Sequence, residues 1–208
     1  ARFTDKQMQS VRREEQRKAE IVGEVGALAM LDHPSSAVKR PRAKDVREDL
    51  CTLILAAKPE VVIGHNLADK HDTHVALALR TIEALRALPR RARPRKFYGG
   101  EVWSDLDWMP DDDKVRWDVS ARENIQAALL GVFDSQISGG KRYDLAATAR
   151  RRAAATYFQS HQVDATTAAA VGMDLTPLLR DDAIDPADYV GGLVDRFRKD
   201  VLKRVERF

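Results

Sequence analysis

The sequence predicts an α/β fold: a mostly parallel, Rossmann-like sheet flanked by helices, with a cover of helices toward the C-terminus. The β-branched run at residues 61–63 is followed by a polar loop and by an apolar-periodic run that begins at Val75. This order is typical of a strand, a loop and a helix. A buried strand at residues 27–31 and a helix at 45–57 are expected to form an earlier βα unit. Two βα units in succession favour a parallel sheet with helices on its faces.

The remaining elements follow from local patterns. Residues 5–25 are expected to form a charged helix, and residues 34–42 a basic loop interrupted by prolines. Strands are expected at Phe97-Tyr98 with residues 101–103 and at 114–119. Later helices are expected from a capping box at Ser120 and Glu123 to the Gly139-Gly140 pair, over residues 144–161, and from the Asp185-Pro186 cap onward. The last helix places its packing face at Val190, Leu193, Val194, Phe197 and Val201.

Length and charge limit the classes of protein. The 208 residues suit one domain with a full core, so we expect a single domain over 1–208. Lys and Arg number 35 against 32 Asp and Glu, a net charge of only +3, so nucleic acid is not an expected partner. The basic cluster at 89–96 is predicted to be a solvated connector. No apolar run is long enough to span a membrane, and the single Cys51 fits a reducing compartment, so we expect a cytoplasmic protein.

The loop at residues 64–74 carries the predicted site. It holds three of the five histidines, His65, His71 and His74, and two aspartates, Asp69 and Asp72. Imidazole and carboxylate are the ligands of hydrolytic Zn²⁺, and residues three apart at a helix start can face one centre. The aspartates could orient the rings. In the plainer interpretation, Asp72 or Thr73 only caps the following helix.

The run from His65 to His74 resembles the second motif of the PIG-L/LmbE family of zinc-dependent N-deacetylases. The resemblance implies that His74 binds the metal and that His71 stabilises the oxyanion. The family usually has Asp before the ligand, where this chain has Thr73. An Arg-x-x-Glu pair on the first helix implies substrate contacts from Arg12 and Glu15.

The remaining site assignments complete this hypothesis. Asp72 is assigned to catalysis together with His71, and His65 and Asp69 to substrate binding. Segments 101–108, 133–136 and 139–144 resemble a branch of the family sometimes joined to a glucosamine-6-phosphate deaminase-like domain. In this chain Phe133-Asp134 precede the Ser-Gln pair, where the family often has a histidine.

One family motif has no counterpart. The Ala-His-Pro-Asp-Asp run, which supplies two ligands and the general base, has only a weak echo at residues 32–36, where serines replace the carboxylates. We therefore expect the first strand and first metal motif to lie outside this span, and the 208 residues alone to bind zinc poorly and show no deacetylase activity.

The resemblance implies removal of an N-acetyl group from an N-acetylglucosaminyl-type amino sugar with Zn²⁺ or another divalent metal as cofactor. The alternative is a catalytically inactive sugar-binding or scaffold domain. The expected partner is a small-molecule amino sugar.

Overall fold

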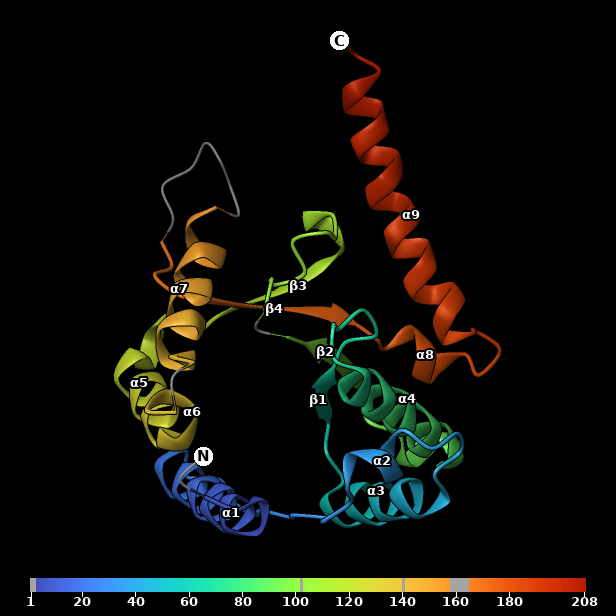
Figure 1. Ribbon diagram of the computed structural model, residues 1–208. Helices are drawn as coiled ribbons and strands as arrows, with labels where there is room; N and C mark the ends of the chain where they lie inside the picture. The colour runs from blue at the N-terminus through green and yellow to red at the C-terminus, as the bar shows by residue number, and fades with distance from the viewer. Residues whose placement is uncertain (1–2, 102, 140, 158–164) are drawn as a thin grey trace. The chain divides into compact units, whose positions relative to one another are not determined.

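The computed structural model describes residues 3–101, 103–139, 141–157 and 165–208, and Figure 1 shows their helices and strands. The chain divides into two compact units. Unit 1 consists of Ala1–Met30 and Trp117–Ala170, and unit 2 consists of Leu31–Arg116 and Val171–Phe208. Two strands, β3 (Lys114–Asp118) and β4 (Ala169–Asp174), continue along the chain from one unit to the other.

Unit 2 contains most of the small sheet and the helices around it. Its elements are α2 (Ser35–Val38), α3 (Lys44–Ala57), β1 (Val61–His65), α4 (Asp72–Ala87), the 3₁₀ helices η1 (Arg90–Ala92) and η2 (Asp111–Asp113), β2 (Lys96–Gly100), α8 (Pro177–Arg180) and α9 (Pro186–Val205). Helix α4 packs against β1, α2, α3 and α8. The predicted helix, strand, loop and helix between residues 45 and 87 are therefore confirmed.

The sheet has four strands in the order β1-β2-β4-β3. Strands β1 and β2 are parallel, with Val61 opposite Lys96 and His65 opposite Gly100, whereas β2 and β4 are antiparallel. The fold is thus α/β as expected, but the sheet is small and mixed rather than mostly parallel. The sequence did not predict β4, because its Ala and Gly residues have weak strand preference and gain it only by pairing with β2.

Two expected strand segments are wrong. Residues 27–31 form no strand and are largely exposed, because no neighbouring strand pairs with the backbone of this short apolar run. Beyond β2, Glu101 and Trp103 lie outside any strand, and Val102 lies outside the described residues. The loop expected at 34–42 contains the short helix α2.

Phe97 of β2 is the largest fully buried side chain of unit 2. The other large, fully buried apolar side chains of the described residues also belong to this unit: Val46, Ile82, Leu85, Leu106, Met173, Leu175, Leu178 and Leu179. They come from α3, α4, β4, α8 and the loops between. This core fixes the end of β1 and the start of α4.

The basic segment at 89–96 is not simply a solvated connector. The Arg93 side chain is only 6% exposed and pairs with Asp182 at 2.6 Å. Its guanidinium also donates to the carbonyl oxygens of Leu88, Arg86 and Leu179. The planar array of five N–H donors explains why an arginine is found at a site with several acceptors.

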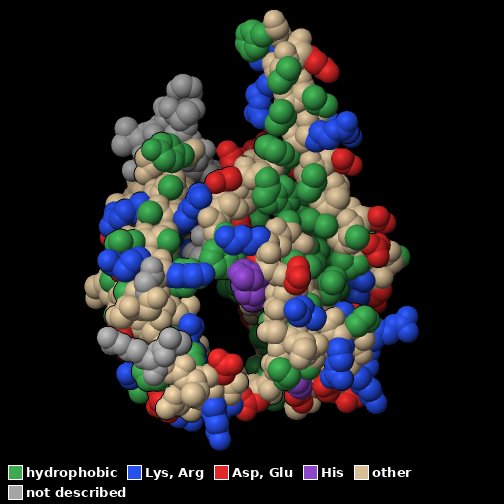
Figure 2. All heavy atoms as spheres, in the orientation of Figure 1, with side chains coloured by type: hydrophobic (Ala, Val, Ile, Leu, Met, Phe, Trp, Pro, Cys, Tyr) green, Lys and Arg blue, Asp and Glu red, His purple; other side chains and the backbone are tan. Residues whose placement is uncertain are grey.

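Helix α9 begins as predicted, with Asp185 accepting from the Ala187 and Asp188 amides. Its predicted packing face is confirmed only in part, since Leu193 is buried but Val194 is 46% exposed. The other members of that face are half-buried: Val190, Phe197 and Val201. Apolar side chains are visible along this helix in Figure 2. No helix in the described part of the chain is long and apolar enough to cross a membrane.

Unit 1 is built from helices: α1 (Asp5–Val22), η3 (Ser120–Arg122), α5 (Glu123–Gly131), α6 (Asp134–Ile137) and α7 (Tyr143–Thr156). Helix α1 packs against α5 and α6, and α7 packs against both of them. The helix expected up to Gly139-Gly140 is therefore divided in two. The predicted helix over 144–161 ends at Thr156, and residues 158–164 lie outside the described residues.

The capping box predicted at Ser120 and Glu123 is wrong. Ser120 donates its hydroxyl to Asp118 and accepts the backbone N–H of Thr167 and Ala168. Glu123 accepts a hydrogen bond from the Thr167 hydroxyl and pairs with Arg152. Both side chains bind residues 167–168, far along the chain, instead of capping the helix.

Candidate metal centre

The candidate site lies in unit 2, where β1 ends and α4 begins. His65 is the last residue of β1, and the loop after it is fixed by two side-chain turns. Asn66 Oδ1 accepts the Ala68 N–H at 2.7 Å, and Asp69 Oδ1 accepts the His71 N–H at 2.8 Å. Such turns favour Asn and Asp because their short side chains reach the backbone two residues on. These two hydrogen bonds stabilise one conformation of the loop backbone.

A glycine brings this loop close to the neighbouring strand. A Cβ on Gly99 of β2 would lie 2.7 Å from Asn66 Cα and 2.9 Å from the His65 carbonyl oxygen. Asn66 is fully buried, and its side-chain amide faces the Gly100 carbonyl oxygen at 3.5 Å. Only a residue without a side chain lets the two backbones approach so closely.

Helix α4 begins directly after the loop. His71 is its N-cap residue, and the His71 carbonyl oxygen accepts the N–H groups of His74 and Val75. The expectation that Asp72 or Thr73 caps the helix is wrong, since Asp72 is already its first residue and no side chain caps this end. His74 therefore lies in the first turn and its ring turns back toward the loop.

His65, Asp69 and His74 form the one group of possible metal ligands found among the described residues, with their ligand atoms within 4.8 Å of one another. His74 Nδ1 lies 3.0 Å from Asp69 Oδ2. An ionised carboxylate only accepts hydrogen bonds, so this contact favours the tautomer in which Nδ1 carries the proton and Nε2 is the nitrogen that would bind a metal. Two imidazoles and a carboxylate fit the donor preference of Zn²⁺.

The two imidazoles are stacked. The His65 and His74 ring centroids are 3.9 Å apart and their planes differ by 5°. Lone pairs of parallel rings lie in parallel planes and cannot meet at one point, so one ring must rotate for both histidines to bind the same ion. The residues present thus have suitable chemistry for a metal but need a side-chain rearrangement.

Burial and charge set the protonation of this cluster. Burial lowers the pKa of His65, and the neighbouring His74 lowers it further while Asp69 opposes the change. Burial alone would raise the pKa of Asp69, but hydrogen bonds from the His71 amide and from His74 hold it below the usual value. Near neutral pH the cluster therefore offers a neutral imidazole and an anionic carboxylate, the forms that bind metals.

The wall of the site contains the other residues of the loop and one from the segment after β2. The His71 ring centroid is 5.0 Å from that of His74 and 5.4 Å from that of Trp103. Lys70 places its Nζ 4.2 Å from the centre of the Trp103 ring. His71 and Asp72 are exposed, and Figure 2 shows that histidine side chains reach the surface.

The two substrate residues expected on the first helix belong to unit 1. The Arg12 side chain is 45% exposed and lies 3.9 Å from the Glu15 carboxylate. Glu15 is buried, and its carboxylate accepts the N–H and hydroxyl of Ser135 at 2.6 and 2.8 Å. This hydrogen bonding gives Glu15 a structural role, and substrate contact by Arg12 stays a prediction.

The sequence predicted that Asp69 could orient a histidine ring, and Asp69 does contact His74 Nδ1 at 3.0 Å. It assigned His65 and Asp69 to substrate binding, however, and did not predict that both join His74 as possible metal ligands. The available signal was that His65 ends a strand and that Asp69 and His74 are five residues apart across a helix start. Trp103 gave no signal, because it comes from a distant segment. The sequence therefore contained the ligands but did not show that they meet.

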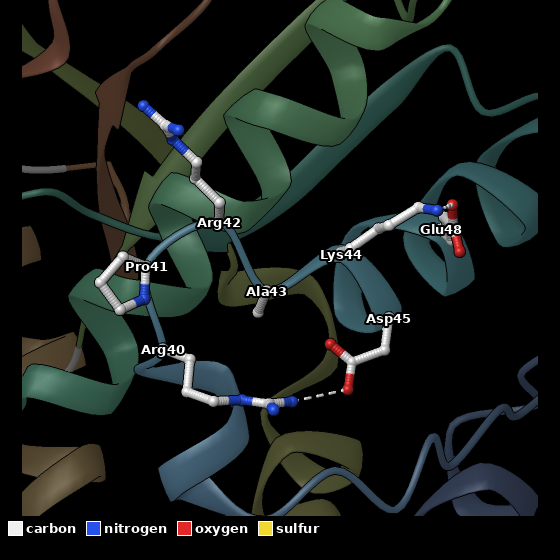
Figure 3. A pocket seen from close by; sticks show the side chains of 7 residues that line it. All are labelled: Arg40, Pro41, Arg42, Ala43, Lys44, Asp45 and Glu48. Atoms are coloured by element: carbon white, nitrogen blue, oxygen red, sulfur yellow. Dashed lines mark hydrogen bonds and ion pairs between the residues drawn. The ribbon is translucent and has the colours of Figure 1, made fainter.

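A hollow of unit 2 has a volume of about 410 Å³ and lies at the start of α3. Figure 3 shows Arg40 directed to Asp45, at 2.9 Å, and Lys44 directed to Glu48, at 3.5 Å. Because these cations already have carboxylate partners, the hollow provides a weaker candidate than the histidine cluster.

Comparisons with known proteins define the fold only. No protein-family model and no curated protein sequence matches this chain. A crystal structure of a conserved protein from Thermus thermophilus matches with a TM-score of 0.61 and 20% identity, covering 85% of this chain and 78% of that one. The 4-carboxy-2-hydroxymuconate hydratase GalB from Pseudomonas putida matches with a TM-score of 0.58 and 18% identity, covering 84% and 75%.

Proposed function

We propose that this chain is a metal-dependent hydrolase that removes the N-acetyl group of an N-acetylglucosaminyl-type amino sugar. The observation that supports the proposal is the meeting of His65, Asp69 and His74 where β1 ends and α4 begins. Sites in α/β folds commonly form at the carboxyl ends of strands. The choice of N-acetyl hydrolysis as the reaction is based on the resemblance of the same loop to the PIG-L/LmbE motif.

His65, Asp69 and His74 would hold the ion. A bound Zn²⁺ would supply Lewis acidity, which lowers the pKa of water and polarises the amide carbonyl. Asp69 favours the His74 tautomer with Nε2 unprotonated, through the 3.0 Å contact to Nδ1. The sequence alone identified a single ligand and so predicted poor zinc binding. The structure adds two donors, and for this reason we propose that the chain as it stands binds the ion.

The exposed residues of the loop would act on the substrate. His71, at the N-cap of α4, would donate a hydrogen bond to the amide oxygen as negative charge develops there. Asp72 forms no hydrogen bond or ion pair with another described residue, so its carboxylate is free to accept a proton from the attacking water.

Zinc content and acetate release test the proposal together. The purified chain should bind about one zinc per molecule, and His74→Ala should lose both zinc and acetate release from N-acetylglucosamine because one of three ligands is gone. His71→Ala should keep zinc but release acetate about 10²–10³-fold more slowly. His33→Ala is the matched control, since His33 pairs with Asp49 at 2.8 Å rather than joining the cluster.

The inactive sugar-binding or scaffold domain is the second candidate. It is favoured by the parallel stack of His65 and His74, which is a stable arrangement without an ion. Sugar binding without stoichiometric zinc would support this candidate. Because a fold neighbour is a hydratase, product analysis must show free acetate rather than water addition alone.

A further inference from the structure

Lys70 is an exposed cation at the wall of the candidate metal centre. Its Nζ lies 4.2 Å from the centre of the Trp103 ring, and the same ring lies 5.4 Å from His71 and 6.4 Å from His74, measured between centroids. Among the described residues Lys70 has no carboxylate partner. A positive charge is therefore held beside the site without an anion to neutralise it.

The backbone around Lys70 is held by hydrogen bonds, whereas its side chain is exposed. The turns made by Asn66 and Asp69 lie on the N-terminal side of Lys70, and α4 begins at Asp72, two residues after it. The ammonium group lies over the aromatic ring. Such a contact at an exposed position is weak, and a charge-assisted hydrogen bond to an anion is stronger.

We propose that Lys70 and Trp103 form the specificity element of this site and select amino sugars that carry an oxyanion substituent, a carboxylate or a phosphate. The inference rests on the proposed function, because it names the substrate class of the same site. Lys70 leaves the ring to pair with the oxyanion. The indole face then packs against the C–H face of the sugar, as aromatic rings pack against apolar surfaces in ligand sites.

The geometry assigns separate tasks to the loop residues. His65, Asp69 and His74 hold the reacting centre, His71 faces the amide, and Lys70 reads a charge elsewhere on the sugar. Because Lys70 and His71 are adjacent in the loop, the charged substituent and the amide bind at neighbouring positions of the site. A neutral amino sugar still meets the reacting centre but lacks the partner for Lys70.

The test compares sugars that differ in charge. Calorimetry with the zinc-loaded full chain should show N-acetylglucosamine 6-phosphate and N-acetylmuramic acid binding at least about tenfold more tightly than N-acetylglucosamine, with the preference falling as salt rises. The phosphate and carboxylate arms show which oxyanion is preferred. Lys70→Met should remove the preference, and Lys70→Arg should keep most of it.

Controls separate this inference from the proposed function. Lys199→Met removes the same charge from an exposed position on α9 and should keep the preference. Zinc content and acetate release report on the proposed function, whereas the ratio of affinities reports on Lys70 even if no acetate appears. Trp103→Ala should weaken binding of all three sugars. Equal affinities in the wild type, a preference retained by Lys70→Met, or no binding of any sugar would overturn the inference.

Discussion

The two units are stabilised in different ways. Unit 2 contains the large, fully buried apolar side chains of the described residues, of which Phe97 is the largest. In unit 1 the buried apolar residues of the described part are all alanines: Ala19, Ala147, Ala155, Ala168 and Ala169. Its helices are joined by side-chain hydrogen bonds such as that of Glu15 with Ser135. The candidate metal centre thus belongs to the unit with the larger buried apolar side chains.

Phe97→Ala should have the largest effect. Removing this fully buried ring leaves a cavity and should lower the free energy of unfolding by about 3–5 kcal/mol. Ala147→Gly in unit 1 should cost only about 1 kcal/mol, chiefly through helix preference. Urea denaturation would measure the free energy of unfolding of each variant, and hydrogen exchange would show which unit is affected. Similar losses in the two variants would contradict the comparison.

Gly99→Ala tests whether the close approach of β2 to the loop positions the metal ligands. The new methyl group would overlap the backbone of His65 and Asn66, so we expect a loss of about 1–3 kcal/mol and weaker zinc binding. Gly192→Ala is the control, because its Cβ would meet no atom within 4 Å and a helix gains up to about 1 kcal/mol from the change. Zinc titration and denaturation would be compared for both. Unchanged zinc affinity in Gly99→Ala would argue against positioning by close backbone approach.

Glu15→Ala should loosen unit 1 alone. It leaves the Ser135 N–H and hydroxyl without their acceptor, which should cost about 1–3 kcal/mol. Hydrogen exchange should rise in α1 and α6 but not in the core of unit 2. Glu14→Ala, at a side chain 61% exposed, should change stability by less than about 0.5 kcal/mol. Faster exchange throughout unit 2 in Glu15→Ala would show that the two units are coupled.

Asp182→Asn should have the smallest effect, which is seen most clearly in how stability changes with pH. The hydrogen bond from Arg93 lowers the pKa of Asp182 below the usual value of an aspartate. The unfolded chain therefore binds the proton more readily, so this stabilisation is complete above about pH 5 and is lost as the pH falls through the folded pKa. Wild type should lose stability more steeply below about pH 4 than Asp182→Asn. Asp195→Asn, at an exposed α9 carboxylate, should follow the wild-type curve.

The sequence by itself determined the elements that depend on neighbours along the chain. The β-branched run, the polar loop and the apolar period predicted β1 and α4, and the Asp185-Pro186 pair predicted the start of α9. Each of these signals acts within one strand or within one or two helical turns, where propensity and capping suffice. The position of His71 and His74 at the helix start follows from the same local rules.

The tertiary structure decided the features that depend on partners far along the chain. Strand β4 exists through its pairing with β2, and Arg93 is buried because the carbonyl of Leu179 and the carboxylate of Asp182 lie beside it. Trp103 reaches His71 because β1 and β2 are parallel, so the segment after β2 begins beside the end of β1. Such contacts are set by packing and strand pairing rather than by local preference, so the sequence predicted the histidine loop but not the cluster and wall that it forms.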